Sequence, residues 1–241
     1  MTTALLITRR ELGAYFRSMT GYVIAAIVLL VDGLLFNVWA MGGNEKLSAE
    51  VVSQFFYAAS GTTMIASVFI SMRLLAEERQ TGTLVLLTSS PVHDWQIVLG
   101  KFLSAFIFLA LITLATVYMP LLIKVNGKVS FGHLAAGYVG LLLLGSAALA
   151  IGTFGSAIAR TQVLAAIFSG CIVVALVLCW LLAKVTEKPF ADVFLAIALW
   201  GRHFPPFQTG TIHARDVVYY LAITYVALFA ATRVLEARRW R

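Results

Sequence analysis

Long apolar runs alternate with short polar connections along almost the whole chain. Six such runs cover residues 21–41, 55–75, 99–123, 133–158, 162–184 and 216–236. A helix of about 20 residues is long enough to cross the hydrocarbon core of a bilayer, about 30 Å thick. The runs are continuous rather than alternating, which favours helices over the strands of a β-barrel. The pattern therefore predicts an all-α, polytopic membrane protein, with residues 1–241 forming a single transmembrane domain.

An amphipathic stretch precedes the first run. On a helix over residues 4–19, one face carries Leu5, Leu12, Phe16 and Met19, and Arg9, Arg10 and Arg17 can point away from it. This pattern is typical of a helix that lies in the membrane interface. We predict such an interfacial helix within residues 1–20.

The connection over residues 185–215 is long and partly apolar. Its apolar part, Phe190 to Trp200, is only about 11 residues long, which is too short to cross a bilayer. Pro205 and Pro206 then interrupt any helix. We predict a re-entrant or interface-lying hairpin here, on the external side.

Small residues recur in the fourth run. Ala148, Gly152 and Ser156 are spaced four apart, so they line one face of a helix. A stripe of this kind lets another helix approach closely. It predicts packing and carries no information on a substrate.

The basic residues predict the orientation. With the N-terminus inside, eleven of the 18 Lys and Arg residues fall on the inner side and seven on the outer side. Positive charge gathers in cytoplasmic connections, so both termini are predicted to be cytoplasmic. The net charge of +7 reflects these cationic flanks more simply than a nucleic-acid partner.

Residues that could carry catalysis or bind a metal are sparse. The four histidines, His93, His133, His203 and His213, have no metal-ligand spacing, and Cys171 and Cys179 suit small apolar positions in a helix. The Gly100-Lys101 pair lacks the glycine loop of a nucleotide-binding motif. We therefore expect no catalytic residue, no metal site and no ATP site in this chain.

Asp32 is the carboxylate that falls well inside a predicted span, with Asn37 a turn and a half further on. Intramembrane carboxylates are costly and often functional, for example in proton relays. A structural role, in which Asp32 faces the bundle and bonds a neighbouring helix, is the favoured interpretation. A proton-coupled carrier that uses Asp32 is the less favoured one.

The connection between the second and third runs is charged at its ends and apolar in its middle. Glu77, Glu78 and Arg79 continue the second run as a helix, and Thr81-Gly82-Thr83 marks a turn. An apolar stretch, Leu84 to Leu87, follows and is ended by Pro91. A short apolar helix framed by charge suits the groove of a partner protein. We predict a cytoplasmic coupling segment over residues 76–98.

This segment resembles a known signature. The run AEERQTGTLVLLTSSPVHDWQIVLGKF is similar to the EER-x-x-GT-L-x-x-L-L-x-x-P-V-x-x-x-x-I-V-x-G-K pattern of ABC-2 type transporter permeases. The N-terminal ITRRELGAYFRSMTGYV resembles their interfacial helix. The stretches GTIHARDVVYY and RVLEARRWR resemble the gliding-motility branch, with nitrous-oxide-reductase-maturation permeases similar in layout.

The resemblance implies a fold and partners. It implies a permease subunit of the bacterial cytoplasmic (inner) membrane that pairs with a second permease copy or a related permease. It also implies two copies of a separate ABC ATPase, which uses ATP and Mg, while this chain binds no cofactor. The coupling contacts would be made by Glu77, Glu78, Arg79, Gly82, Thr83, Leu84, Leu87 and Pro91.

Two functions fit the resemblance. In the first, ATP hydrolysis by the partner drives export or extrusion along a path at the dimer interface, near the first, second and fifth spans. In the second, the same fold transmits a shape change to a periplasmic or envelope protein without moving a solute.

Overall fold

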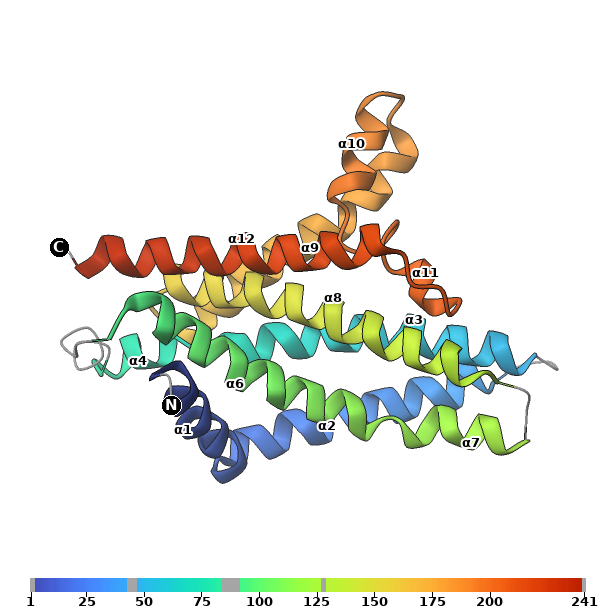
Figure 1. Ribbon diagram of the computed structural model, residues 1–241, viewed down its shortest axis with the longest axis horizontal. Helices are drawn as coiled ribbons and strands as arrows, with labels where there is room; N and C mark the ends of the chain where they lie inside the picture. The colour runs from blue at the N-terminus through green and yellow to red at the C-terminus, as the bar shows by residue number, and fades with distance from the viewer. Residues whose placement is uncertain (1–2, 43–46, 84–91, 127–128, 240–241) are drawn as a thin grey trace.

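The computed structural model describes residues 3–42, 47–83, 92–126 and 129–239, and the described chain is helical throughout (Figure 1). Its elements are α1 (Thr3–Arg17), α2 (Met19–Leu35), the π-helical turn η1 (Phe36–Ala40), α3 (Ser48–Ser71), α4 (Ala76–Gln80), α6 (Asp94–Ala115), α7 (Tyr118–Asn126), α8 (Phe131–Ile158), α9 (Gln162–Val185), α10 (Phe190–Ile197), α11 (Pro205–Gln208) and α12 (Ala214–Arg239).

Six helical stretches are long and apolar enough to cross a membrane. They are Met19–Ala40, Ser48–Gln80, Asp94–Val125, Phe131–Ile158, Gln162–Val185 and Ala214–Arg238. The predicted all-α polytopic fold is confirmed. Both termini and α4 lie at one end of the bundle, and α11 lies towards the other end (Figure 1).

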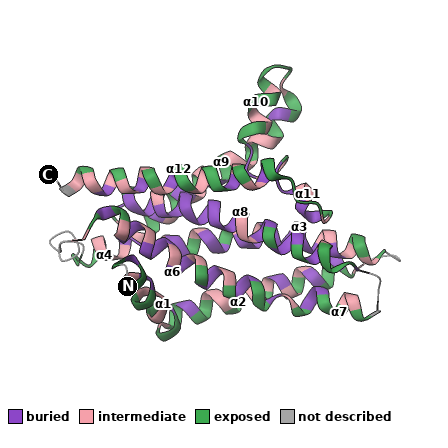
Figure 2. Ribbon diagram, in the orientation of Figure 1, coloured by how far each residue is buried: buried purple, intermediate pink, exposed green. Residues whose placement is uncertain are grey.

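The central helix is α8, which packs against α3, α9 and α12 and has more buried residues than α3 or α6 (Figure 2). The predicted small-residue stripe is confirmed, because Ala148, Gly152 and Ser156 are all buried. A Cβ atom at Gly152 would clash with Ser71 of α3. The small side chains along this face allow α3 and α8 to pack closely.

Two predicted spans differ from the observed helices. The second begins at Ser48 rather than near residue 55, because Ser, Glu and Gln residues extend the helix beyond the apolar run. The third begins at Asp94 and is interrupted between Ala115 and Tyr118. At this break, the Thr116 hydroxyl donates to the carbonyl of Thr113 at 2.7 Å and lies 3.1 Å from the Tyr138 hydroxyl.

The N-terminal helix packs through a different face from the one its apolar residues indicate. Leu5 and Phe16 of α1 are 49% and 46% exposed, whereas Ala4, Thr8 and Tyr15 are buried. Small and polar residues of α1 make this contact because α1 crosses α6 at Gly100. The two helices are so close there that a larger group would not fit. Met19 is not part of this helix, since the Ser18 side chain caps a new one, α2, by accepting from Gly21 N at 3.2 Å.

The connection over 185–215 has two dissimilar halves. Its first half, α10, has no buried residue, packs against α9 and projects with it from the bundle (Figure 1). The second half folds back, and Leu199, Phe204 and Phe207 are fully buried. Polar contacts anchor it: Trp200 Nε1 donates to Ser60 Oγ at 3.0 Å, and His203 Nδ1 lies 2.7 Å from Asp216 Oδ1.

Candidate functional site

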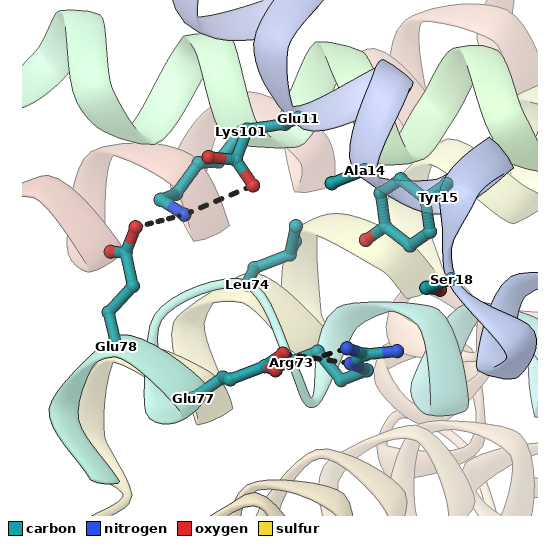
Figure 3. Close-up of a pocket in the computed structure, with 9 residues that line it drawn as sticks. All are labelled: Glu11, Ala14, Tyr15, Ser18, Arg73, Leu74, Glu77, Glu78 and Lys101. Atoms are coloured by element: carbon teal, nitrogen blue, oxygen red, sulfur yellow. Dashed lines mark hydrogen bonds and ion pairs between the residues drawn. The ribbon is translucent and has the colours of Figure 1, made fainter. Parts of the chain in front are cut away.

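Charged side chains from three parts of the chain gather at the end of the bundle that holds both termini. They line a cleft of about 180 Å³ between α1, the α3–α4 junction (residues 72–75) with α4, and α6 (Figure 3). We call this set the charged cluster; its members are Arg10, Glu11, Arg73, Glu77, Glu78 and Lys101. It contains three cations and three carboxylates, so its formal charges balance.

Lys101 is the buried centre of the charged cluster, with a residue exposure of 1%. Its Nζ lies 2.8 Å from Glu78 Oε1 and 3.6 Å from Glu11 Oε2 (Figure 3). An ammonium group is tolerated in such a place only when carboxylates compensate its lost hydration. The pairs therefore tie α4 and α1 to α6 through a single side chain.

Arg10 closes the cluster on its exposed side. Its Nη2 lies 2.6 Å from Glu11 Oε1 and 3.8 Å from Glu78 Oε1. The hydrogen bond to Glu11 raises the pKa of Arg10, which keeps the guanidinium charged. Glu78 thus faces two cations, and its Oε2 makes no hydrogen bond to any residue that the structure describes.

The uncharged residues that line the cleft are Ala14, Tyr15, Ser18 and Leu74. Tyr15 stacks on Phe108 with 4.8 Å between ring centroids, and its hydroxyl donates to the carbonyl of Ile70 at 3.4 Å. Burial raises the pKa of Tyr15, so this residue is a neutral donor. Beside it, Arg73 Nε donates to Glu77 Oε2 at 2.8 Å (Figure 3). This bond joins the α3–α4 junction to α4.

The third residue of the Glu-Glu-Arg motif reaches a different helix. Arg79 Nη1 donates to the carbonyls of Ile158 and Ala159 at 3.1 and 2.9 Å. These carbonyls belong to the end of α8, where backbone acceptors lack partners within the helix and the dipole favours a cation. Arg238 of α12 donates to Ile158 as well, at 2.8 Å. The end of α8 therefore joins α4 to α12.

A serine of α8 holds the turn between α3 and α4. Ser156 Oγ accepts hydrogen bonds from the backbone N–H groups of Leu75 and Ala76, both at 3.0 Å, and donates to the carbonyl of Met72 at 3.3 Å. These backbone groups are left without helical partners because the chain turns after Ser71. Ser156 therefore acts as a cap for this turn, although it belongs to another helix.

The turn after α4 occurs where the sequence predicts it. Gly82 has a φ of +75°, a conformation that glycine adopts at little cost. The hydroxyls of Thr81 and Thr83 donate to the carbonyls of Glu77 and Glu78, at 3.0 and 3.4 Å, and close the end of α4. The predicted apolar contacts, Leu84, Leu87 and Pro91, lie outside the described residues.

The intramembrane pair of polar residues is not brought together. Asp32 is buried, and its Oδ1 accepts a hydrogen bond from the Thr62 hydroxyl of α3 at 2.5 Å. Asn37 is exposed in the π-helical turn. Asp32 therefore connects two neighbouring spans, the geometry of a structural contact.

The resemblance implies that Glu77, Glu78 and Arg79 make charged contacts at the edge of a coupling segment. All three also have partners inside the chain, and Glu78 and Arg79 reach other helices. The contributions of Glu11 and Ser156 were missed. Lys101 could have pointed to Glu11, because a lysine buried at the start of a span needs carboxylates nearby.

A metal centre finds no support in the structure. Among the described residues, no three His, Cys, Asp or Glu side chains are grouped closely enough to hold a metal ion. The cleft instead combines internally paired charges with the helix that precedes the predicted coupling segment.

Comparison with protein families matches residues 11–237 to the model described as ABC-2 family transporter protein. The chain belongs to this family. The match covers all six candidate spans apart from their extreme ends, and members of the family are membrane subunits for transport. No curated protein matches the chain significantly. The predicted resemblance to ABC-2 permeases is thus confirmed at the level of the family.

Proposed function

We propose that this ABC-2 family protein is the permease subunit of an ABC transporter whose ATPase is a separate chain. ATP and Mg would be bound by that ATPase, and the residues after α4 would form the coupling segment it grips. The observation that supports this is the attachment of α4 to three other helices: α6 through Glu78, and α8 and α12 through the carbonyl of Ile158.

The attachment gives a route for motion. A displacement of α4 acts on Lys101 and, through Glu11, on α1. It also acts on the end of α8 through Arg79 and Ser156. Since α8 is the central helix, a small shift of α4 is passed to most of the bundle. Buried pairs suit this role because they resist separation more strongly than exposed ones.

The remaining assignments follow from the same proposal. Both termini and α4 would face the cytoplasm of a bacterial inner membrane, and two ATPase copies would bind below two permease copies. A second copy, identical or related, would cover part of α2 and α9, in which only two and four residues are buried. Export or extrusion is the proposed direction, within the gliding-motility or nitrous-oxide-reductase-maturation branch.

The test uses Thr83, an exposed residue between α4 and the predicted apolar contacts of the coupling segment. Glu78 and Arg79 are less suitable because both have partners on other helices. We would purify the tagged full chain from its native membrane and measure Mg-dependent ATP hydrolysis in the eluate. Wild type should carry an ATPase subunit, and Thr83→Trp should lose it. The matched control is Thr211→Trp, an exposed threonine at the far end of the bundle, which should keep it. ATPase-free eluates from wild type, or equal recovery with both variants, would refute the proposal.

One observation supports the second mode of action. The α9–α10 hairpin projects from the bundle, and Phe190 and Val193 of α10 are 66% and 53% exposed. An envelope protein bound there would make this permease a transmitter of shape change. ATPase turnover of the reconstituted complex that rises with a periplasmic protein, and not with any solute, would distinguish it from an exporter.

A further inference from the structure

A groove between α2 and α3 is unlike the charged cleft near it. It has a volume of about 330 Å³ and is lined by residues of α2 from Thr20 to Val31 and of α3 from Thr62 to Met72. Apart from the two threonines, its lining side chains are apolar. The Thr62 hydroxyl already donates to Asp32, so the groove offers no unsatisfied polar group at its deep end.

The length of the groove matches one leaflet of a bilayer. From Thr20 to Val31 a helix rises by about 16 Å, at about 1.5 Å per residue. Half of a hydrocarbon core of about 30 Å is about 15 Å. The groove thus runs from the membrane surface, where α1 meets α2, to about the midplane. This is the depth of a phospholipid acyl chain.

Cations gather at the shallow end of the groove. A second, more open hollow lies on α1, lined by Arg9, Arg10 and Arg17 with Leu6, Gly13, Ala14 and Ser18. Ser18 of this hollow is two residues from Thr20 of the groove, so the two hollows approach each other where α1 meets α2. Arg9 and Arg17 are exposed and make no ion pair with any residue that the structure describes.

We propose that α1, α2 and α3 form a binding site for an anionic phospholipid of the leaflet that contacts α1. Its acyl chain lies in the groove, and its phosphate and headgroup meet Arg9 and Arg17. The arginines favour a lipid over a helix of a second copy as the occupant. An anionic phospholipid has an apolar chain for the groove and a phosphate for the arginines. The proposal does not depend on the ATPase.

The test compares two lipids on the purified full chain without ATP. Native mass spectrometry would follow the retention of phosphatidylglycerol and of phosphatidylcholine with the same acyl chains. Phosphatidylglycerol should be retained at one molecule per chain and preferred over phosphatidylcholine. Arg9→Gln with Arg17→Gln should weaken phosphatidylglycerol retention by roughly 25-fold, at about fivefold per cation. Arg202→Gln, an exposed cation elsewhere, should leave it unchanged.

The groove is tested separately. Ile27→Trp should fill it and reduce the retention of both lipids, whereas Leu30→Trp, on the same helix but outside the groove, should not; these residues are 57% and 61% exposed. If Ile27→Trp does not fold, Val23→Trp serves instead.

Three results would overturn the proposal. Equal retention of the two lipids would indicate ordinary solvation by lipid. If the arginine variants lose phosphatidylglycerol but Ile27→Trp retains it, surface charge alone would account for the binding. A change in oligomeric state on filling the groove would identify a second copy as the occupant.

Discussion

The side-chain oxygen of Ser156 accepts a hydrogen bond from the backbone N–H of Ala76 at 3.0 Å, although 80 residues separate them. Through this bond and the one from Leu75, α8 supplies the polar group that the break after α3 requires. The turn from a membrane span into α4 is therefore fixed by the centre of the bundle and not by local sequence.

Replacing Ser156 should consequently destabilise the protein. Ser156→Ala leaves two buried N–H groups without an acceptor, which costs about 1–3 kcal/mol. The control is Ser104→Ala, since Ser104 is also buried but its hydroxyl donates to Lys101 of its own helix. Thermal unfolding in detergent should show a clearly lower midpoint for Ser156→Ala. Equal midpoints for the two variants would contradict the capping role.

The pair between Glu78 and Lys101 can be measured by a double-mutant cycle. Lys101→Met removes the nearest cation from Glu78 and leaves Arg10 as the remaining partner of both Glu78 and Glu11, so it should cost about 1–3 kcal/mol. Adding Glu78→Gln to it should recover part of this loss, because the remaining carboxylate, Glu11, keeps Arg10 as its partner. Unfolding free energies of the four proteins give the coupling. Strictly additive effects would show that the pair carries no interaction energy.

Gly100 should determine whether α1 docks. A Cβ atom there would lie 2.8 Å from the carbonyl oxygen of Ala4 and 3.0 Å from Ile7, so Gly100→Ala should push α1 away and cost about 1–3 kcal/mol. Trypsin should then cleave faster after Arg9 and Arg17. Gly61→Ala is the control, because nothing lies within 4 Å of its added Cβ. Unchanged cleavage in Gly100→Ala would show that the close crossing is dispensable.

Asp32 should tolerate loss of its charge. In Asp32→Asn the amide oxygen can still accept from the Thr62 hydroxyl, so stability should change by less than about 0.5 kcal/mol. Asp32→Leu removes the acceptor and should cost about 1–3 kcal/mol. Liposomes that contain the wild-type protein should show no more proton flux than empty liposomes. A flux that disappears in Asp32→Asn would establish the proton-coupled carrier instead.

The spans were predictable because burial in a membrane depends on the hydropathy of single segments. The small-residue stripe of Ala148, Gly152 and Ser156 was predictable for the same reason, as a pattern within one helix. The break at Thr116 lies four residues before Pro120, which has no N–H to donate to the Thr116 carbonyl, so this signal in the sequence was overlooked. The face of α1 that packs against α6 was not predictable, because a glycine on α6 decides it.

The charged cluster shows a similar limit. The motif from Glu77 to Lys101 was visible in the sequence, and the structure explains part of its spacing: Glu78 and Lys101 pair, while Gly100 admits α1. The partner on α1, Glu11, lies 90 residues before Lys101, and no periodicity connects them. Complementary charges can be counted in a sequence, but their pairing depends on how the helices cross.

The crossing of α1 over α6 has a mechanical consequence. At Gly100 the two backbones touch, and the Thr8 hydroxyl donates to the Gly100 carbonyl at 3.1 Å. The Thr3 hydroxyl donates to Gln96 Oε1 at 2.6 Å and Tyr15 stacks on Phe108 at 4.8 Å, so α1 is held to α6 at both of its ends as well. A pull on Glu11 would then move α1 and α6 together. The angle at which the chain enters α2 at Ser18 would follow the motion of the third span.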